Sequence, residues 1–284
     1  MAFALRNNHE KLAAFLPPLL IESERVAESV WHGTHGRRRA GRGDSFWQFR
    51  RYDAGDPVTR IDWRQSARTD RLYVREREWE AAQTTCLWAD MSGSMHYASN
   101  KNIPSKAEEA KLLMLALASL LLRGGEKVLW GEGEHLTPLN GKPSLERAAS
   151  TDLHNQTSVP PLPAHHRRAH MILASDFLMP QEVLLERMRT YAAQNLHGVF
   201  LHIIDPLEAS FELDGRVELQ GTEGEKSHLV PNAAALRHDY RQRFEAHENQ
   251  LRHMAESAGW FYLRHLTSDS AQATLLRLYQ YLAG

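Results

Sequence analysis

Residues 84–94 have the sequence TTCLWADMSGS, in which a short, largely apolar run is followed at once by one acidic and two hydroxyl residues. A run of this length, without regular alternation of polar and apolar residues, is typical of a strand that is covered on both faces. Asp90, Ser92 and Ser94 come directly after it, and Gly93 lets the chain turn tightly between the two serines. We therefore predict a buried strand whose following loop gathers three side-chain oxygens.

The rest of the chain alternates strands with helices. Short apolar runs predict further strands at 127–130, 170–175, 199–204 and 260–263. Helical patterns lie at 105–123, 181–195, 232–258 and 270–282. Helices of this length between strands imply parallel βαβ units and one sheet covered on both faces. Ser105 and Glu108 predict a capping box at the first of these helices, and Asp214-Gly215 predicts a hairpin turn between alternating runs.

The composition limits the classes of protein that need to be considered. The chain has 284 residues, of which 42% are apolar and 24% charged, so a globular fold is expected. Its net charge of −1 does not favour general nucleic-acid binding. A single cysteine, Cys86, excludes an internal disulfide framework. Neither a signal peptide nor an apolar run near the ~20 residues of a membrane span is evident, so the predicted location is the cytoplasm.

Three predicted strands end in an aspartate, namely Asp90, Asp176 and Asp205. The carboxyl ends of parallel strands meet at one rim of a sheet, where ligands commonly bind. Carboxylate and hydroxyl oxygens are the ligands that Mg²⁺ or Mn²⁺ prefers. We predict a divalent cation at Asp90, Ser92, Ser94 and Asp176, and interpret Asp205, which precedes a proline, as a turn residue. The alternative is that all of these side chains only cap turns and helices.

The segment before the first strand is rich in arginine and aromatic residues. Its large rings are Trp47, Phe49, Tyr52, Trp63, Tyr73 and Trp79. Acidic residues are spaced among the arginines, which favours internal ion pairs and packing on the domain over a nucleic-acid surface. The arginines of the preceding glycine-rich loop have fewer acidic residues near them to balance their charge. We predict that these arginines contact a partner: Arg37, Arg38, Arg39 and Arg42. The predicted division is a helical and Arg-rich segment at 1–80 and an α/β domain at 81–284.

These motifs resemble known families. The D-x-S-x-S-M loop at 90–95 resembles the metal-ion-dependent adhesion site of von Willebrand factor A domains. The Arg-rich segment resembles bacterial domain-of-unknown-function family 58 at Gly41, Gly43, Phe46, Arg51-Tyr52, Gly55-Asp56, Arg60-Ile61-Asp62-Trp63, Ala67-Arg68, Leu72 and Arg75-Glu76. The resemblance implies a von Willebrand factor A-like (Rossmann-like) α/β domain, with a mainly parallel central sheet flanked by helices and the Arg-rich segment packed on it. It also implies a MoxR-type AAA+ ATPase as partner, and a threonine as a further metal ligand, for which Thr137 and Thr151 are candidates.

The leading functional hypothesis is a non-enzymatic binding module. Its Mg²⁺ or Mn²⁺ would accept an aspartate or glutamate of a partner, and the module would serve the assembly or maturation of protein complexes. One alternative is a metal-dependent phosphoryl-transfer enzyme with Asp90 as nucleophile or ligand. The hydroxyl of Ser92 stands where such phosphatases carry a second carboxylate, which argues against this enzyme. Another alternative is a nucleic-acid binder that uses the Arg-rich segment.

Overall fold

The computed structural model describes residues 18–34, 46–53, 58–68, 71–77, 83–133, 135–151, 158–163, 169–219 and 227–282. The chain forms two compact units, a larger one that contains α2 (Pro18–Thr34) and the chain from Gln83 onward, and a smaller one within His35–Ala82. The boundary therefore differs from the predicted division at residue 80, because α2 belongs to the larger unit. The apolar residues that bury α2 in the core of that unit follow helical spacing: Leu20, Val26, Ala27 and Val30.

The larger unit is built on one six-stranded sheet. Its strands are β3 (Thr84–Ala89), β4 (Lys127–Glu132), β5 (His135–Leu139), β6 (His170–Ser175), β7 (His197–Ile204) and β10 (Phe261–Leu266). They lie in the order β10-β7-β6-β3-β4-β5, and only the edge strand β5 runs antiparallel to its neighbour. The predicted α/β class and mainly parallel sheet are confirmed. The prediction missed β5, because this edge strand is largely exposed and contains Pro138, so it shows no apolar run.

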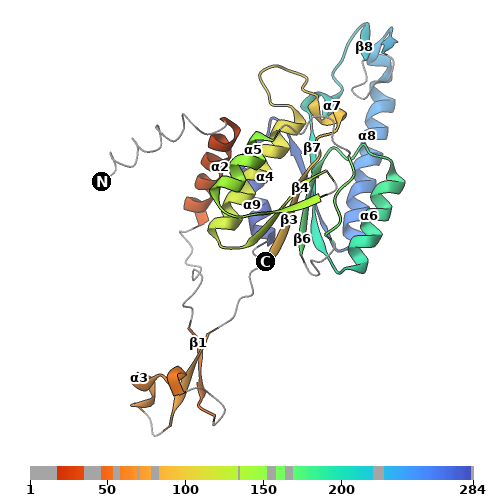
Figure 1. The fold of residues 1–284 in the computed structure, drawn as a ribbon. Coiled ribbons are helices and arrows are strands. Elements are labelled where there is room, and N and C mark those ends of the chain that lie inside the picture. Colours follow the sequence, from red (N-terminus) through yellow and green to blue (C-terminus); the bar gives the residue numbers. More distant parts are fainter. Residues whose placement is uncertain are drawn as a thin grey trace, which may run out of the picture. The chain divides into compact units, whose positions relative to one another are not determined.

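Helices cover both faces of the sheet (Figure 1). On one face lie α2, α4 (Lys106–Arg123), α5 (Lys142–Ser150) and α9 (Ala271–Leu282), and on the other lie α6 (Gln181–Ala193) and α8 (Ala233–Ser257). Successive residues of β3 serve opposite cores: Leu87 and Ala89 face the α4 side, whereas Cys86 and Trp88 face the α6 side. This two-sided burial explains why the central strands are apolar throughout.

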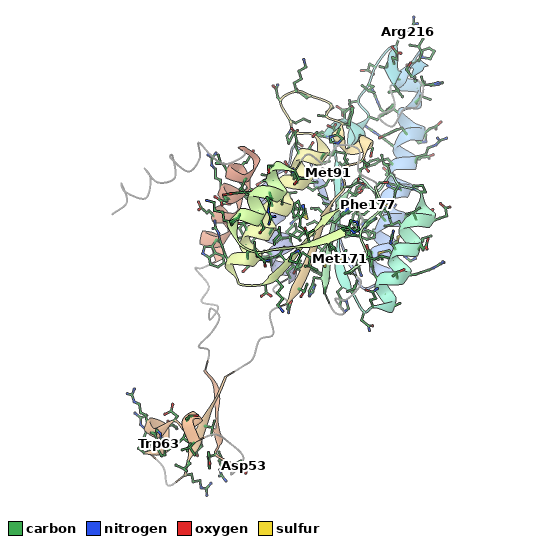
Figure 2. All side chains as sticks on the ribbon, viewed as in Figure 1. Asp53, Trp63, Met91, Met171, Phe177 and Arg216 are labelled. Carbon is green, nitrogen blue, oxygen red and sulfur yellow. The ribbon has the colours of Figure 1, made fainter. Side chains whose placement is uncertain are left out.

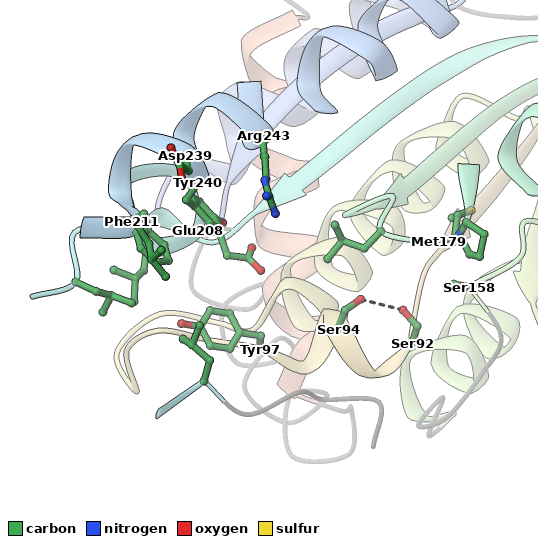
Figure 3. Close-up of a pocket in the computed structure, with 16 residues that line it drawn as sticks. Ser92, Ser94, Tyr97, Ser158, Met179, Glu208, Phe211, Asp239, Tyr240 and Arg243 are labelled. Atoms are coloured by element: carbon green, nitrogen blue, oxygen red, sulfur yellow. Dashed lines mark hydrogen bonds between the residues drawn. The ribbon is translucent and has the colours of Figure 1, made fainter. Parts of the chain in front are cut away.

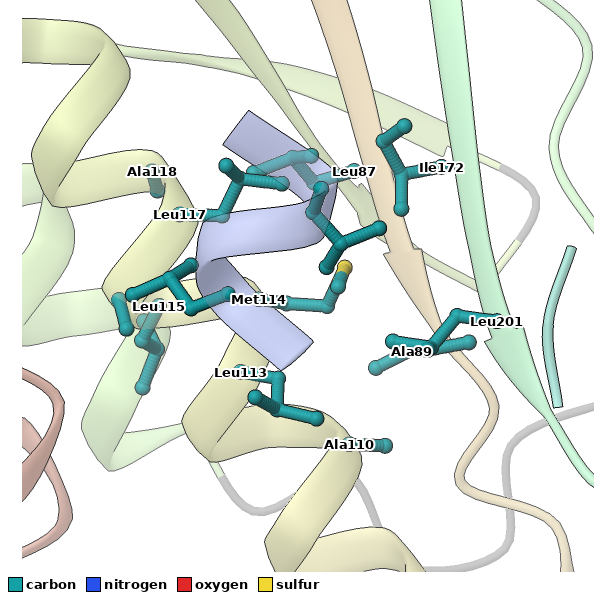
Figure 4. Close-up of a cluster of buried hydrophobic side chains, with 14 of the residues drawn as sticks. Leu87, Ala89, Ala110, Leu113, Met114, Leu115, Leu117, Ala118, Ile172 and Leu201 are labelled. Atoms are coloured by element: carbon teal, nitrogen blue, oxygen red, sulfur yellow. The ribbon is translucent and has the colours of Figure 1, made fainter. Parts of the chain in front are cut away.

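The helix α4 lies at the centre of the first core (Figure 4). It packs against the sheet as well as against α2 and α9, so all of its side chains from Leu112 to Leu121 are buried. The predicted capping box is confirmed: the Ser105 amide donates to the Glu108 carboxylate (2.9 Å), and the Glu108 amide donates to the Ser105 hydroxyl (3.3 Å). Among the described residues, no helix combines the length and apolar character that a membrane span requires.

The predicted hairpin at Asp214-Gly215 is wrong. The strand β8 (Val217–Leu219) pairs instead with β9 (His228–Val230), which is farther along the chain. The guanidinium of Arg237 on α8 donates to the carbonyl oxygen of Leu213 (3.1 Å) and pairs with the Asp214 carboxylate (2.8 Å). These tertiary hydrogen bonds hold the chain before Gly215 in an irregular conformation, so its alternating pattern does not become a strand.

The smaller unit consists of an antiparallel strand pair and two short helical turns. Its elements are β1 (Phe46–Arg51), η1 (Val58–Arg60), α3 (Trp63–Ser66) and β2 (Tyr73–Arg77). The Asp62 carboxylate caps α3 by accepting the Gln65 amide (2.9 Å), and Ile61 and Val74 are buried. Trp63 is 62% exposed on this unit, where Figure 2 labels it. The strand predicted at 71–75 is present as β2, two residues later. The packing of this segment on the larger domain stays a prediction.

Candidate functional site

The order in which the chain adds strands to the sheet reverses between β3 and β6. These strands are parallel neighbours, yet the chain leaves β3 for α4 on one face and leaves β6 for α6 on the opposite face. Met91 and Phe177, which follow Asp90 and Asp176, lie toward one end of the sheet, and Met171 near the start of β6 lies toward the other end (Figure 2). Asp90 and Asp176 therefore stand at the topological switch point, where open parallel sheets bind ligands.

The loop after β3 gathers the oxygens that its sequence predicts. Asp90 is only 1% exposed, and its Oδ1 accepts the backbone amide of Ser92 (2.9 Å). The chain then enters η2 (Gly93–His96), which brings the hydroxyl of Ser92 within 3.3 Å of the hydroxyl of Ser94 (Figure 3). One carboxylate and two hydroxyls thus lie in a single tight turn.

The loop after β6 is tied directly to this turn. The Ser175 hydroxyl donates to Oδ2 of Asp90 (2.6 Å), and the Asp90 amide donates to the carbonyl oxygen of Ala174 (2.8 Å). The amide of Asp176 points to the sulfur of the buried Met95 (3.3 Å), which gives the methionine of the loop motif a structural role. Phe177 has a positive φ of 54° that turns the chain away immediately afterward.

A buried lysine, which the sequence did not reveal as a site residue, connects three loops. Lys106 begins α4, and its ammonium group lies 2.9 Å from Oδ2 of Asp176 and 2.6 Å from Oε1 of Glu208. Burial acts to lower the pKa of Lys106, but the carboxylates of Asp176 and Glu208 outweigh it and hold that pKa above its ordinary value. Lys106 is therefore a fixed positive charge between the loops that follow β6 and β7.

Asp205 follows the third strand of the prediction, β7. Its Oδ1 accepts the amide of Leu207 (2.8 Å) and caps α7 (Pro206–Ser210), while its Oδ2 accepts the amide of Ser99 (2.9 Å). The interpretation of Asp205 as a turn residue is confirmed. Glu208 completes this cap by accepting the Asp205 amide (3.1 Å), so one carboxylate serves both the cap and Lys106.

Asp90 differs from Asp176 in its electrostatic surroundings. Burial raises the pKa of Asp90 to about 6, and the charge of Asp176 acts in the same direction, while hydrogen bonds from Ser175 and Ser92 act against it. The hydrogen bonds that its carboxylate accepts from the Ser175 hydroxyl and the Ser92 amide come from neutral groups. Asp90 is thus a buried carboxylate that no cationic side chain of the described residues contacts in the way that Lys106 contacts Asp176.

The donor set fits a hard divalent cation. Each carboxylate oxygen of Asp90 has a second lone pair beyond its hydrogen bond, and the hydroxyls of Ser92 and Ser94 are neighbours. Each oxygen of Asp176 also accepts one hydrogen bond, from Lys106 and from the Leu178 amide (3.2 Å), but the positive charge of Lys106 repels a cation, so this residue fits as a ligand acting through water. The described residues contain no cluster of three His, Cys, Asp or Glu side chains suited to a metal, so the hydroxyls are essential to the set.

Neither predicted threonine lines this site. The Thr137 hydroxyl lies on β5 and donates to the carbonyl oxygen of Trp130 (3.4 Å), whereas the Thr151 hydroxyl donates to that of Arg147 (2.8 Å) at the end of α5. Ser158 lies between α5 and β6 and lines the same hollow as Ser92 and Ser94 (Figure 3). The sequence offered no signal for it, because Ser158 stands in a polar, proline-rich stretch without periodicity.

The hollow beside the two serines has a volume of about 600 Å³. The apolar part of its wall comes from Leu178, Met179, Pro180, Leu207, Phe211, Leu213, Leu219 and Leu236. Tyr97, Glu208, Asp239, Tyr240 and Arg243 also line it. A hollow of this size with convergent polar groups at one end is typical of a ligand-binding site.

Comparison with known proteins places the chain in a family. The family described as "Protein of unknown function DUF58" matches residues 48–250. The chain belongs to the DUF58 family. An uncharacterised protein of Mycobacterium tuberculosis is 26% identical over 268 residues, which is 88% of this chain and 83% of that protein, and an uncharacterised protein of Mycobacterium bovis matches with the same values. The match of the family spans parts of both units, so the Arg-rich segment and the α/β domain form one family pattern.

Two solved structures are also similar to this DUF58 protein. An aerotolerance-related membrane protein from Bacteroides fragilis is 14% identical, covers 72% of this chain and 99% of its own, and has a TM-score of 0.45. The conserved hypothetical protein BatB from Bacteroides thetaiotaomicron is 17% identical, covers 71% of this chain and 99% of its own, and has a TM-score of 0.39.

Arg37, Arg38, Arg39 and Arg42 lie outside the described residues of this DUF58 protein, so their role stays a prediction. Within the described residues, the arginine that the structure places at the site is Arg243 of α8.

A buried histidine behind the site predicts a pH dependence of stability. His202 on β7 is 2% exposed, its Nδ1 lies 2.7 Å from the Tyr262 hydroxyl, and its ring packs edge-on against Phe177. Burial lowers the pKa of His202 to about 3, and the charges of His247, Lys106 and Arg264 act in the same direction. Protonation therefore favours the unfolded chain, whose histidine has a pKa near 6.5, and stability is lost as pH falls below that value.

We expect His202→Gln to remove this loss. Between pH 6.5 and 5, the wild type should lose about 2 kcal/mol more free energy of unfolding than the variant, at ~1.4 kcal/mol per pH unit. Urea unfolding of both proteins at several pH values measures the difference. Groups that titrate equally in the wild type and the variant cancel in this comparison. The exposed His238→Gln on α8 is the control. Parallel pH profiles of the wild type and His202→Gln would contradict the prediction.

Proposed function

We propose that this DUF58 protein is a non-enzymatic protein-binding module with a von Willebrand factor A-like domain. It holds Mg²⁺ or Mn²⁺ at Asp90, Ser92 and Ser94, with Asp176 beside the ion. The single observation that carries the proposal is the state of Asp90, a buried carboxylate with a raised pKa, without a cationic contact, next to two converging hydroxyls. Its place at the switch point of a mainly parallel sheet supports the same conclusion.

The chain's own residues define how a partner would be bound. Asp90 supplies one negative charge, and Ser92 and Ser94 supply neutral oxygens, so these donors neutralise a divalent ion only in part. Lys106 holds Asp176 by an ion pair and thereby reduces the negative charge that this carboxylate offers. When bound, the metal supplies an open coordination position for a carboxylate oxygen of the partner. The partner site therefore favours an aspartate or glutamate.

The partner class rests on the family resemblance. We propose a MoxR-type AAA+ ATPase in the cytoplasm, which the module would assist in assembling or maturing protein complexes. An acidic surface of the ATPase would approach the rim formed by Ser92 and Ser94. Arg37, Arg38, Arg39 and Arg42 would add charge-assisted contacts and speed association.

The geometry of Asp90 also supports a module without phosphoryl-transfer activity. Both carboxylate oxygens are held by hydrogen bonds and the residue is 1% exposed, so attack on a phosphorus atom would require this loop to open. Ser92 cannot serve as the acidic partner that such chemistry needs.

The proposal is tested by metal titration followed by capture of the ATPase. We expect calorimetry of chelator-treated protein to show one site filled at millimolar Mg²⁺ or Mn²⁺. A purified MoxR-type ATPase should bind the immobilised full chain about tenfold or more weakly in excess chelator, or when Asp90 is replaced by alanine, because the bridging ion is lost. Far-UV circular dichroism checks that Asp90→Ala is folded.

The control is Glu182→Ala, which removes an exposed carboxylate on α6 and should leave capture unchanged. Equally tight capture in excess chelator would refute a bridging metal. Metal-dependent hydrolysis of p-nitrophenyl phosphate that disappears in Asp90→Asn would instead establish the phosphoryl-transfer alternative.

A further inference from the structure

The hollow beside Ser92 and Ser94 has an apolar wall that is open to solvent. Three of its leucines are unusually exposed for side chains of this kind: Leu178 at 59%, Leu236 at 41% and Leu219 at 40%. They come from the loop after β6, from α8 and from β8, so distant parts of the chain place them around one space. Contiguous exposed apolar surface of this kind marks a binding region more often than scattered leucines do.

The far side of this wall is rigid. Phe211 ends α7 with a φ of 47°, a left-handed conformation that is costly for a bulky side chain. Its ring stacks on Tyr240 with 4.2 Å between the ring centroids, and its amide donates to the carbonyl oxygen of Leu207 (2.7 Å). The aromatic pair is therefore held in place before any ligand arrives.

A guanidinium that has no partner among the described residues faces the polar side of the hollow. Arg243 of α8 makes no hydrogen bond or ion pair within the described chain, and it extends toward Glu208 and the serine side (Figure 3). Glu208 is already bound to Lys106. Asp239, one turn earlier on α8, lies beside Tyr240 and away from the serines (Figure 3). The serine side thus offers an arginine that suits a carboxylate.

We infer that the hollow binds a short extended segment of a partner protein in which an acidic residue stands close to a large apolar residue. The acidic side chain lies between the Ser92–Ser94 rim and Arg243, and the apolar side chain packs against Phe211, Tyr240 and Leu236. The inference rests on the proposed function and adds an apolar contact to the acidic contact proposed there. A peptide fits better than a small acid, because the hollow has a volume of about 600 Å³ and three exposed leucines from separate elements, Leu178, Leu219 and Leu236, line its wall.

A peptide-display selection tests the inference. The probe is a library of random short peptides, selected on the immobilised full chain in millimolar MgCl₂. We expect enrichment of peptides in which Asp or Glu lies within a few residues of Leu, Ile, Phe or Trp. Dissociation constants of the enriched peptides are then measured by fluorescence anisotropy. Arg243→Glu and Leu236→Glu should each weaken binding by about tenfold or more.

Matched controls separate the hollow from general charge effects. Arg189→Glu on α6 reverses an exposed arginine elsewhere, and Ala235→Glu adds a carboxylate next to Leu236 outside the lining. Both should leave the dissociation constant within about twofold. No enrichment, enriched peptides without the acidic–apolar pair, or equal effects of the control variants would overturn the inference.

The experiments distinguish failure of the peptide site from failure of the metal site. If Arg243→Glu and Leu236→Glu abolish binding but calorimetry shows no metal uptake, the peptide site stands and the metal proposal fails. If metal binds at Asp90 and no acidic–apolar peptide is selected, the metal proposal stands and the peptide site fails.

Discussion

Replacing Lys106 with methionine is expected to lower the free energy of unfolding by about 3–5 kcal/mol at neutral pH, because it leaves carboxylates in low-dielectric surroundings without their cation. Lys106 is fully buried, and its ammonium group is shared by Asp176 and Glu208 at 2.9 and 2.6 Å. Methionine keeps a similar apolar volume, so loss of packing contributes little. Chemical denaturation with circular dichroism measures the change.

The control for Lys106→Met is an exposed ion pair. Arg123 lies 3.9 Å from Glu28, and both side chains are more than a third solvent-exposed, at 34% and 46%. Arg123→Met should cost less than about 1 kcal/mol, because water screens this pair. The loss in Lys106→Met should also shrink toward pH 5, where the stranded carboxyl groups can be protonated. A loss as small as that of Arg123→Met would show that Lys106 is not needed to neutralise the site.

Lys106→Met further connects stability with the proposed metal. Removing a positive charge beside Asp176 should raise the affinity for Mg²⁺ by about tenfold or more, since the ion no longer faces a neighbouring ammonium group. Excess Mg²⁺ should then restore part of the lost stability. Unchanged affinity in calorimetry would place the cation away from Asp176.

Replacing Asp90 with asparagine is expected to stabilise the metal-free protein above pH 6. The pKa of Asp90 is about 6 in the folded chain, against 3.8 as its ordinary value, mainly because of burial. A carboxyl group with a raised folded-state pKa makes the protein less stable as pH rises from the lower value through the higher. The total penalty is about 3 kcal/mol, and the neutral amide should recover about 2–3 kcal/mol of it at pH 7.5.

Metal should reverse this advantage. At a hundredfold excess of Mg²⁺ over its dissociation constant, the wild type gains about 2.7 kcal/mol, and Asp90→Asn should gain little because a neutral amide binds the ion weakly. Thermal unfolding with MgCl₂ and with chelator measures both effects. Asp205→Asn is the control, because that carboxylate is buried but serves as a helix cap. If Asp90→Asn destabilised the chelated protein and Mg²⁺ shifted both proteins equally, Asp90 would have a purely structural role.

The different surroundings of Asp90 and Asp176 explain why Lys106→Met and Asp90→Asn should act in opposite directions. The negative charge of Asp176 is compensated by Lys106 within the fold, whereas Asp90 has hydrogen bonds from neutral groups only. Removing the compensating charge destabilises the chain, and removing the uncompensated one relieves it. A bound divalent ion would act on Asp90 as Lys106 acts on Asp176.

The sequence alone determined those features that depend on nearby residues. The apolar run at 84–89 predicts a strand buried on both faces, and β3 forms there because its alternate side chains enter two cores. Ser105 and Glu108 predict the start of α4, since a capping box needs only residues three positions apart. The turn that brings Ser92 and Ser94 together is local in the same sense. The Asp214-Gly215 hairpin failed because Arg237, a residue of a later helix, competes for that segment.

Only the tertiary structure decided which charges meet. The sequence places Asp90 and Asp176 at strand ends, but their adjacency depends on β6 pairing with β3 rather than with another strand. Lys106 is 70 residues from Asp176 and 102 from Glu208 in the chain, and nothing in its local pattern shows that it will be buried between them. Arg243 likewise lines the same hollow as Ser92 and Ser94 only because α8, far from these serines in the sequence, packs against the sheet. The spacing of apolar residues and the helix caps are encoded within about ten residues of sequence. Ion pairs and binding hollows depend instead on the order in which the strands pack.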